Sequence, residues 1–238
     1  LDFGRLDVHI RLRRYRLLLT THYSLLTTTP MTLIQLRHLI AIVDSGLNLT
    51  VARGDRVLFS GLCFELEAGT ARVVMGANGA GKTSLLRAVA GLLRPLAGQI
   101  SLTDYEDRQA GLYLMGHQDG LKGGRTAGEE LAFWCGWAGA DPAGIARAVE
   151  RLALTPLLGL PVRVLSAGQK KRLALARLVA VPRPLWLLDE TLAPLDAGWR
   201  QAVADLAETH LAEGGMILAA AHDPMPFEHQ VLTLEAGR

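Results

Sequence analysis

The chain has 238 residues, and 50% of them are hydrophobic, which is enough to bury a core and excludes a wholly disordered protein. Its charge is nearly balanced, with 25 Lys and Arg against 23 Asp and Glu, which argues against a dedicated polyanion binder. Two cysteines form neither a disulfide framework nor a metal cluster, so a reducing compartment fits best. No apolar run reaches the ~18 residues that a membrane helix needs, so the chain is not expected to cross a membrane.

Residues 1–46 form an extension to which we assign no function. The numbering begins at Leu1, and residues 8–43 contain arginines interleaved with Leu and Thr but no acidic residue. This composition is typical of an organellar transit peptide. We prefer the simpler interpretation that the segment is upstream sequence ahead of a start at Met31.

From Leu47 onward the pattern predicts short strands that lead into a helix. Alternation of apolar and polar residues indicates half-exposed strands over 47–51, 56–60 and 62–66. An apolar run over 71–75 indicates a buried strand that ends at a glycine cluster. A helix is expected over 82–93, and its apolar face would consist of Leu85, Leu86, Val89 and Leu92.

The second half of the chain predicts a helical insertion between further strands. The composition shifts to Ala, Gly and helix formers over 123–165, and we expect a helical subdomain spanning about 119–180. Further strands are predicted over 99–102, 111–115, 185–188 and 216–221. Because continuous apolar strands separated by helices are typical of a parallel sheet buried on both faces, the expected fold class is α/β.

A phosphate-binding loop is the clearest functional motif. Residues 76–83 fit G-x-x-x-x-G-K-[ST] and lie between a predicted strand and a predicted helix, which argues against a chance glycine-rich turn. The backbone N–H groups of such a loop and the helix N-terminus can surround phosphate oxygens. The residues expected to contact the nucleotide are Gly76, Ala77, Asn78, Gly79, Ala80, Gly81, Lys82 and Thr83.

Two carboxylates follow the apolar strand 185–188. Asp189 stands at the C-terminal end of that strand, where ligands bind in open α/β sheets, and can hold Mg²⁺ together with the Thr83 hydroxyl. Glu190 can polarise the attacking water as a general base. Alone, the pair could be a solvated strand end, but the phosphate loop upstream favours a hydrolytic site.

The segment 165–177, LSAGQKKRLALAR, decides between the classes of phosphate-loop protein. Ser166 and Gly168 precede a predicted helix, and a serine at this place could simply be an N-cap. The segment resembles the signature sequence of the ABC ATPases, with Gln169 as its last residue. The resemblance runs from about Leu47 to the C-terminus, and kinase-type and GTPase-type proteins lack this segment.

This resemblance implies a fold and further site residues. The expected fold is the nucleotide-binding domain of ABC ATPases over 47–238, with a RecA-like core, an antiparallel β subdomain and the helical subdomain. Gln118 would be the glutamine that links Mg²⁺ and water to the partner interface. Asp196 would belong to the D-loop and His222 would contact the γ-phosphate, whereas His117 and His229 receive no role.

Three positions depart from the family pattern. Arg53 stands where many ABC ATPases have a tyrosine that stacks on adenine; its guanidinium can stack on a base, or it can be a surface turn residue. Thr191 follows Glu190 where proline is usual, which would loosen the backbone there, and Ala77 replaces the usual Pro or Ser. None of these changes removes a catalytic atom, so ATP hydrolysis remains the expectation.

The resemblance also implies partners. One set of motifs per chain implies a homodimer in which the signature segment of one copy closes the ATP of the other. The stretches 76–93, 116–122 and 165–178 are most similar to the ATPases of bacterial haem-export systems for cytochrome c maturation. Such an ATPase would act peripherally on the cytoplasmic face of the inner membrane, with a CcmB-like integral subunit and CcmC- and CcmD-like proteins.

The sequence is also compatible with other functions and with two interpretations of a group of aromatic residues. The alternatives are the ATPase of another exporter, a soluble ABC ATPase of a non-transport assembly such as the SufC type, or a nucleotide-binding module without turnover. Phe133, Trp134 and Trp137 could form an apolar groove for a membrane partner. Equally, these aromatics could fill the core of the helical insertion.

Overall fold

The computed structural model describes residues 38–41, 49–102 and 108–235, and most of the predicted extension lies outside these ranges. The strands are β1 (His38–Ala41), β2 (Leu49–Arg53), β3 (Arg56–Leu62), β4 (Phe64–Glu67), β5 (Ala71–Met75), β6 (Ser101–Leu102), β7 (Leu112–Met115), β8 (Leu185–Asp189), β9 (Met216–Ala220) and β10 (Gln230–Thr233). The helices are α2 (Lys82–Val89), α3 (Arg108–Gly111), α4 (Ala127–Ala138), α5 (Pro142–Arg151), α6 (Ala167–Ala180) and α7 (Ala197–Ala212). Short 3₁₀ turns cover Thr155–Leu157 and Val162–Val164.

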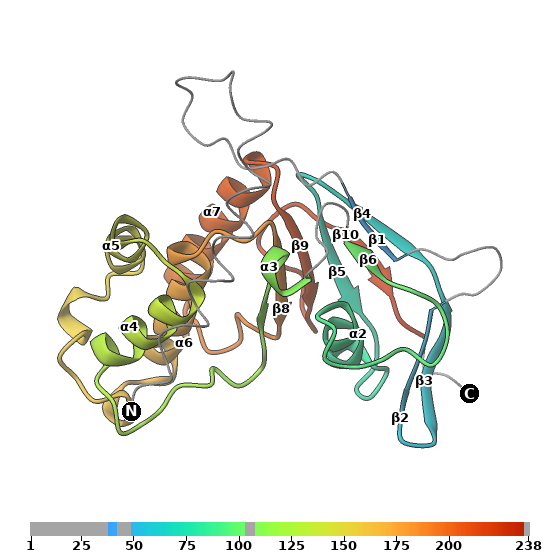
Figure 1. The fold of residues 1–238 in the computed structure, drawn as a ribbon, viewed down its shortest axis with the longest axis horizontal. Helices are drawn as coiled ribbons and strands as arrows, with labels where there is room; N and C mark the ends of the chain where they lie inside the picture. Colours follow the sequence, from blue (N-terminus) through green and yellow to red (C-terminus); the bar gives the residue numbers. More distant parts are fainter. Residues whose placement is uncertain (1–37, 42–48, 103–107, 236–238) are drawn as a thin grey trace, which may run out of the picture. The chain divides into compact units, whose positions relative to one another are not determined.

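A parallel five-stranded sheet in the order β10-β5-β9-β8-β7 forms the centre of the fold. Alternate residues of one strand join different core clusters: Leu185 and Leu187 pack with α2, whereas Trp186 and Leu188 pack with α6 and α7. Figure 1 shows α2 on one side of β8 and β9 and the helices α6 and α7 on the other. The predicted α/β class, with its parallel sheet buried on both faces, is therefore confirmed.

Two smaller antiparallel sheets accompany the central one. The strands β2 and β3 form a hairpin, and β1 pairs with both β4 and β6. The strand β1 lies within the predicted extension 1–46, yet it belongs to the same compact unit, 35–238, as the rest of the described chain. The sequence analysis assigned this stretch to the extension and predicted no strand in it, whereas β1 pairs with strands of the predicted domain.

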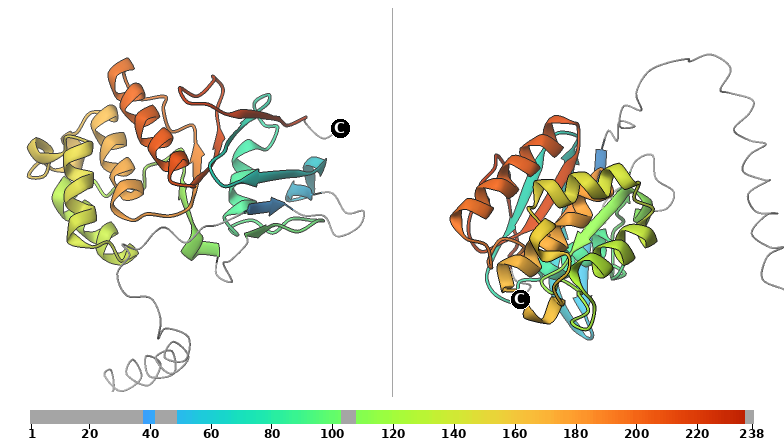
Figure 2. Two further views of the ribbon diagram at one scale, coloured as in Figure 1. Left: turned by 90° about the horizontal axis from the view of Figure 1, so that it is seen from above. Right: turned by 90° about the vertical axis from the view of Figure 1, so that its left-hand side faces the viewer.

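The helices α4, α5 and α6 pack together within the predicted helical subdomain, as Figure 2 shows. Each begins at a polar cap: Thr126 caps α4, Asp141 caps α5 and Ser166 caps α6. Such caps satisfy backbone N–H groups that lack partners inside the helix. Within the part of the chain that the structure describes, no helix combines the length and apolar character that crossing a bilayer requires.

One predicted helix ends earlier than expected, and two elements were not predicted. The predicted helix 82–93 ends at Val89, and Leu92 is 62% exposed instead of facing the core. Gly91 adopts a positive φ of 74°, and this left-handed residue terminates the helix. The strand predicted over 47–51 corresponds to β2, which the structure describes from Leu49 to Arg53. The helix α7 and the strand β10 were not predicted at all.

Beneath the central sheet, His210 of α7 is buried against Trp186. The two rings stack with their centroids 3.9 Å apart, and the His210 Nε2 lies 3.3 Å from the carbonyl oxygen of Met216. Burial lowers the pKa of His210 from 6.5 to about 4, although the backbone carbonyls nearby oppose the shift. The neutral imidazole is therefore part of the core.

We predict that the free energy of unfolding falls as the pH drops from 6.5 to 4. In this window the unfolded chain binds a proton at residue 210 that the folded chain excludes, which costs up to about 3 kcal/mol. Urea unfolding at several pH values measures this slope. The variant His210→Phe keeps a stacking ring but cannot titrate, so its slope should be smaller by about one proton; equal slopes would contradict the prediction.

Candidate functional site

Three neighbouring strands of the central sheet end at one edge and deliver polar side chains there. The strands β9, β8 and β7 are adjacent and parallel, with Asp189 opposite Ala220 and Met115 opposite Leu188. The residues that follow their C-terminal ends therefore lie side by side. These include Glu190 after β8 and His222 after β9.

The phosphate loop, residues 76–83, joins β5 to α2. Gly81 is the N-cap of α2 and has a φ of 105°, and a Cβ there would lie 2.9 Å from the Phe59 ring. Glycine is therefore required by both backbone conformation and space. The Lys82 ammonium folds back over the loop, where it donates to the carbonyl oxygens of Gly76 at 2.7 Å and Ala77 at 3.4 Å. The same ammonium can exchange these carbonyls for the oxygens of a bound phosphate.

Thr83 and Asp189 come together from different elements. The Thr83 hydroxyl, in the first turn of α2, donates a hydrogen bond of 3.1 Å to Asp189 Oδ1 at the end of β8. Burial raises the pKa of Asp189, the Thr83 hydrogen bond opposes this shift, and the neighbouring Glu190 adds to it. A hydroxyl and a carboxylate held at this distance are the hard oxygen donors that Mg²⁺ takes in phosphate sites.

Glu190 is held in an unusual backbone conformation. Its φ is 52°, which non-glycine residues rarely adopt, and its N–H donates to the carbonyl oxygen of Ala220 on β9 at 2.9 Å. The side chain lies with Oε1 at 3.0 Å from Nε2 of His222. Backbone strain of this kind is typical of functional sites, and here it points the carboxylate toward His222.

His117 is a site residue to which the sequence assigned no role. It follows β7, and its Nδ1 lies 3.5 Å from Oε2 of Glu190, so the carboxylate has a histidine near each oxygen. The sequence feature that could have indicated its role is its position directly before Gln118 and shortly after the strand predicted over 111–115. His229 contacts the Phe227 carbonyl and Phe227 ring instead, in agreement with its lack of a predicted role.

Gln118 lies in the loop after β7, where its side chain is exposed. Its neighbour Asp119 forms an ion pair with Lys171 of α6, at 2.5 Å between Oδ1 and Nζ. Neither Asp119 nor Lys171 was singled out from the sequence. Lys171 is 1% exposed, so its burial could only be recognised once α6 was placed against this loop.

The signature segment, residues 166–169, forms the first turn of α6. The Ser166 hydroxyl accepts from the N–H of Gln169 at 3.2 Å, and the Gln169 side chain accepts from the N–H of Ser166 at 2.9 Å. Ser166 is thus the N-cap that the simpler interpretation expected, and it is also exposed. Gly168 lies close to Pro194, since a Cβ there would be 3.4 Å from the Pro194 carbonyl oxygen.

The other predicted contact residues lie on the surface. Asp196 is the N-cap of α7 and accepts from the N–H of Trp199 at 2.9 Å. Arg53 is exposed at the end of β2, in the hairpin whose other strand supplies Phe59. In the described ranges, no hydrogen bond or ion pair joins Arg53, Asp196 or the signature segment to the phosphate loop of the same chain.

Thr191 and Ala77 occupy the positions that depart from the family pattern. Thr191 is 1% exposed, and its hydroxyl has no hydrogen-bond partner among the residues that the structure describes. Ala77 turns its carbonyl oxygen toward Lys82.

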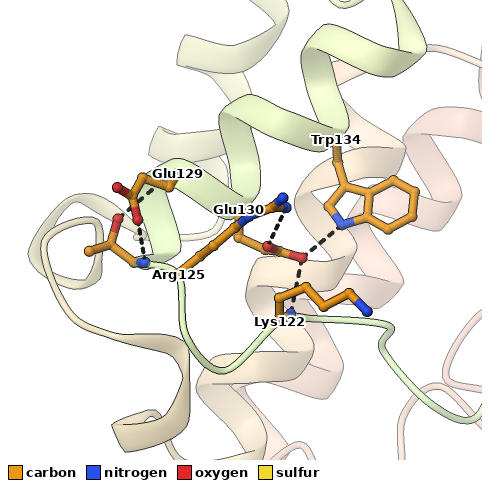
Figure 3. A network of polar contacts seen from close by, with 6 residues as sticks. Lys122, Arg125, Glu129, Glu130 and Trp134 are labelled. Atoms are coloured by element: carbon orange, nitrogen blue, oxygen red, sulfur yellow. Dashed lines mark hydrogen bonds and ion pairs between the residues drawn. The ribbon is translucent and has the colours of Figure 1, made fainter.

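A groove of about 490 Å³ opens between β7 of the central sheet and the helices α4 and α6. Its wall includes Trp134 and Trp137 of α4 and Arg177 of α6. The Arg177 guanidinium stacks 4.1 Å from the Trp134 ring. The Trp134 indole N–H donates to Glu130 at 3.0 Å, as Figure 3 shows. The Trp134 ring is therefore held by Glu130 at its N–H and by Arg177 at its face.

The three aromatic residues of α4 differ in their exposure and in whether they line the groove. Trp137 is 74% exposed and Phe133 is 48% exposed, so these two rings do not fill the core of the helical group. Phe133 does not line the groove; it stacks beneath the guanidinium of Arg125 at 4.1 Å. The groove therefore uses two of the three predicted aromatics.

Comparison with known sequences gives the relatives of the chain. The family model described as ABC transporter matches residues 59–193. A cytochrome c biogenesis ATP-binding export protein CcmA from Rhodopseudomonas palustris (strain BisB5) is 45% identical over 186 residues, which are 76% of this chain and 92% of that protein. The protein of the same name from Rhodospirillum rubrum is 43% identical over 186 residues, which are 76% and 80% of the two chains.

Solved structures share the fold. A bacterial Atm1-family ABC exporter with ATP bound superposes with a TM-score of 0.70 at 23% identity, over 95% of this chain and 42% of that chain. An ATP-binding subunit of an ABC transporter gives a TM-score of 0.68 at 21% identity, over 79% of each chain. The predicted RecA-like core with its β and helical subdomains is confirmed by this likeness.

We predict that Lys82→Ala weakens nucleotide binding by about tenfold to a hundredfold. Removing the ammonium removes a charge-assisted hydrogen bond to phosphate, which contributes roughly 1.5–3 kcal/mol. Equilibrium titration with a fluorescent ATP analogue measures the loss. The exposed Lys122 offers a matched control, and equal affinity of Lys82→Ala and Lys122→Ala would contradict the assignment.

Proposed function

The chain belongs to the ABC transporter family, and we propose that it is the ATP-hydrolysing subunit of an export complex for cytochrome c biogenesis. One observation carries the proposal: at 45% identity, the chain covers 92% of a cytochrome c biogenesis ATP-binding export protein. Haem is the proposed cargo. As an ABC ATPase the chain binds ATP, and hydrolysis is coupled to export.

The phosphate loop and Asp189 would bind the nucleotide with its metal. The backbone N–H groups of residues 76–83 and the Lys82 ammonium would contact the phosphates. The Thr83 hydroxyl and the Asp189 carboxylate, which are 3.1 Å apart, would hold Mg²⁺ together with Gln118. The metal ion would screen the negative charge of the phosphates. Arg53 would stack on the base from the β2–β3 hairpin.

Glu190 would act as the general base of hydrolysis. Its carboxylate would accept the proton of the attacking water while His222, at 3.0 Å from Oε1, fixes its orientation and reaches the γ-phosphate. The positive φ of Glu190 and its backbone bond to Ala220 keep the carboxylate in place before substrate arrives.

A second copy of the chain would complete the site. The signature segment, with the exposed Ser166 and the partly buried Gly168 and Gln169, has no hydrogen bond or ion pair to the phosphate loop of its own chain within the described ranges. It is therefore available to close the ATP bound to another copy, with Asp196 at the same interface. Two identical chains then form two sites related by a two-fold axis.

An integral membrane subunit would occupy the groove beside Trp134 and Trp137. A groove lined by two aromatic rings suits an amphipathic helix, and Trp137 is too exposed to serve only the fold. We propose a CcmB-like subunit as the occupant, with CcmC- and CcmD-like proteins in the same complex. The chain would then act peripherally at the cytoplasmic face of the inner membrane.

We predict that Glu190→Gln abolishes turnover but retains ATP. Removing the base lowers kcat by about a hundredfold or more. The bound ATP, which is not hydrolysed, should then hold two chains together. Phosphate release measures turnover, and light scattering after gel filtration with ATP measures the dimer. Cells that carry only this variant should fail to accumulate haem-loaded c-type cytochromes.

The exposed Glu208 of α7 provides a matched control, since Glu208→Gln removes the same charge away from the site. Wild-type turnover by Glu190→Gln, or a monomer under all nucleotide conditions, would refute the mechanism. Normal cytochromes in cells without ATP hydrolysis would instead favour another exporter.

We predict that Trp137→Ala reduces the fraction of the protein retained on membranes by about tenfold, because interface aromatics contribute ~1–2 kcal/mol each. Phe133→Ala, on the same helix but outside the groove, should be retained like the wild type. Fractionation followed by immunoblotting measures retention. If the wild type itself stays entirely off membranes, a soluble ABC ATPase of the SufC type becomes the better assignment.

A further inference from the structure

Lys171, in the second turn of α6, is a buried charged side chain. It is 1% exposed and belongs to the largest fully buried side chains of the described residues. Its ammonium lies 2.5 Å from Asp119 Oδ1, and among the described residues it has no other acidic partner within an ion-pair distance. A buried ammonium is unfavourable unless it is paired, so the position of Asp119 is fixed by Lys171.

Asp119 directly follows Gln118 on the loop after β7. On the other side of Gln118, His117 lies 3.5 Å from the Glu190 carboxylate. Gln118 itself is exposed between these two contacts. The short segment 117–119 therefore runs from the catalytic carboxylate to the helix α6, and its two ends are held by different elements.

The helix α6 also carries the signature segment. Lys171 stands five residues after Ser166, which is about 7.5 Å along the helix axis. The first turn of α6 is rigid, because Ser166 and Gln169 exchange hydrogen bonds there. Asp119 is therefore linked to Ser166 through Lys171 and one continuous helix.

A second set of polar contacts, centred on Glu130, holds the loop after β7 near Lys122 and Arg125. The buried Glu130 of α4 accepts from the N–H of Lys122 at 3.1 Å, from the Arg125 guanidinium at 3.2 Å and from the Trp134 indole. Figure 3 shows these donors around the one carboxylate. This network ties the loop to the groove, whereas the Asp119–Lys171 pair ties it to the signature helix.

We propose that Asp119 and Lys171 are positioning residues, whose ion pair makes Gln118 and the signature segment move as one body. The inference rests on the proposed roles of Gln118 and Ser166. When Gln118 turns toward Mg·ATP in its own site, the pair carries α6 with it, and the signature segment swings toward the ATP of the second copy. Binding in one site is thereby linked to closure of the other.

The test compares ATP hydrolysis by the full chain in its detergent-solubilised membrane complex. Asp119→Asn and Lys171→Met should each lower kcat at least about tenfold while the KM for ATP changes less than about twofold, because the phosphate loop is untouched. Lys171→Arg keeps the charge and should restore most of kcat. Lys170→Met removes a neighbouring charge that has no ion pair among the described residues and should behave like the wild type.

Hydrogen exchange supplies a readout independent of turnover. In the chain without nucleotide, Asp119→Asn and Lys171→Met should speed exchange of the backbone amides in 116–121, whereas Lys170→Met should not. Unchanged exchange, or a lower melting temperature with wild-type kcat, would overturn the inference. If Gln118→Ala lowers kcat and Asp119→Asn does not, only this inference fails. If the wild type hydrolyses no ATP, the proposed function fails. The hydrogen exchange of residues 116–121 then decides by itself whether the Asp119–Lys171 pair holds the loop in place.

Discussion

The site depends on the parallel pairing of β8 with β7 on one side and β9 on the other. This pairing sets the ends of three strands next to one another, so that His117, Glu190 and His222 meet although they are far apart in the chain. The strands β8 and β9 are buried along their whole length, which makes this end of the sheet rigid. Polar residues are tolerated there because the sheet ends.

Local backbone conformation then orients the phosphate loop and the Glu190 side chain at the C-terminal end of the sheet. Gly81 opens α2 with a left-handed conformation and lets the phosphate loop turn against Phe59. Glu190 adopts a positive φ without being a glycine, and a backbone hydrogen bond to β9 holds it there. The strain at Glu190 is compensated by the packing of the strand before it, which has no freedom to relax.

The helix α6 connects the nucleotide site to the groove. It begins at the signature segment, carries Lys171 in its second turn and presents Arg177 to Trp134 in the groove. A single helix thus contacts the loop after β7 and the groove, and it begins at the segment proposed for the interface with a second copy. This arrangement explains how one small domain can couple a chemical step to a protein outside itself.

The sequence by itself determined the strand-loop-helix around the phosphate loop, the carboxylates after β8 and the signature segment, because each follows from a short run of residues. It also predicted the parallel sheet, since continuous apolar strands need cover on both faces. It missed His117 beside Glu190, the Asp119–Lys171 pair and the pairing of β1 with β4 and β6. These contacts depend on which segments the fold places side by side. The burial of a side chain, or an ion pair between residues distant in the sequence, exists only once the chain has folded.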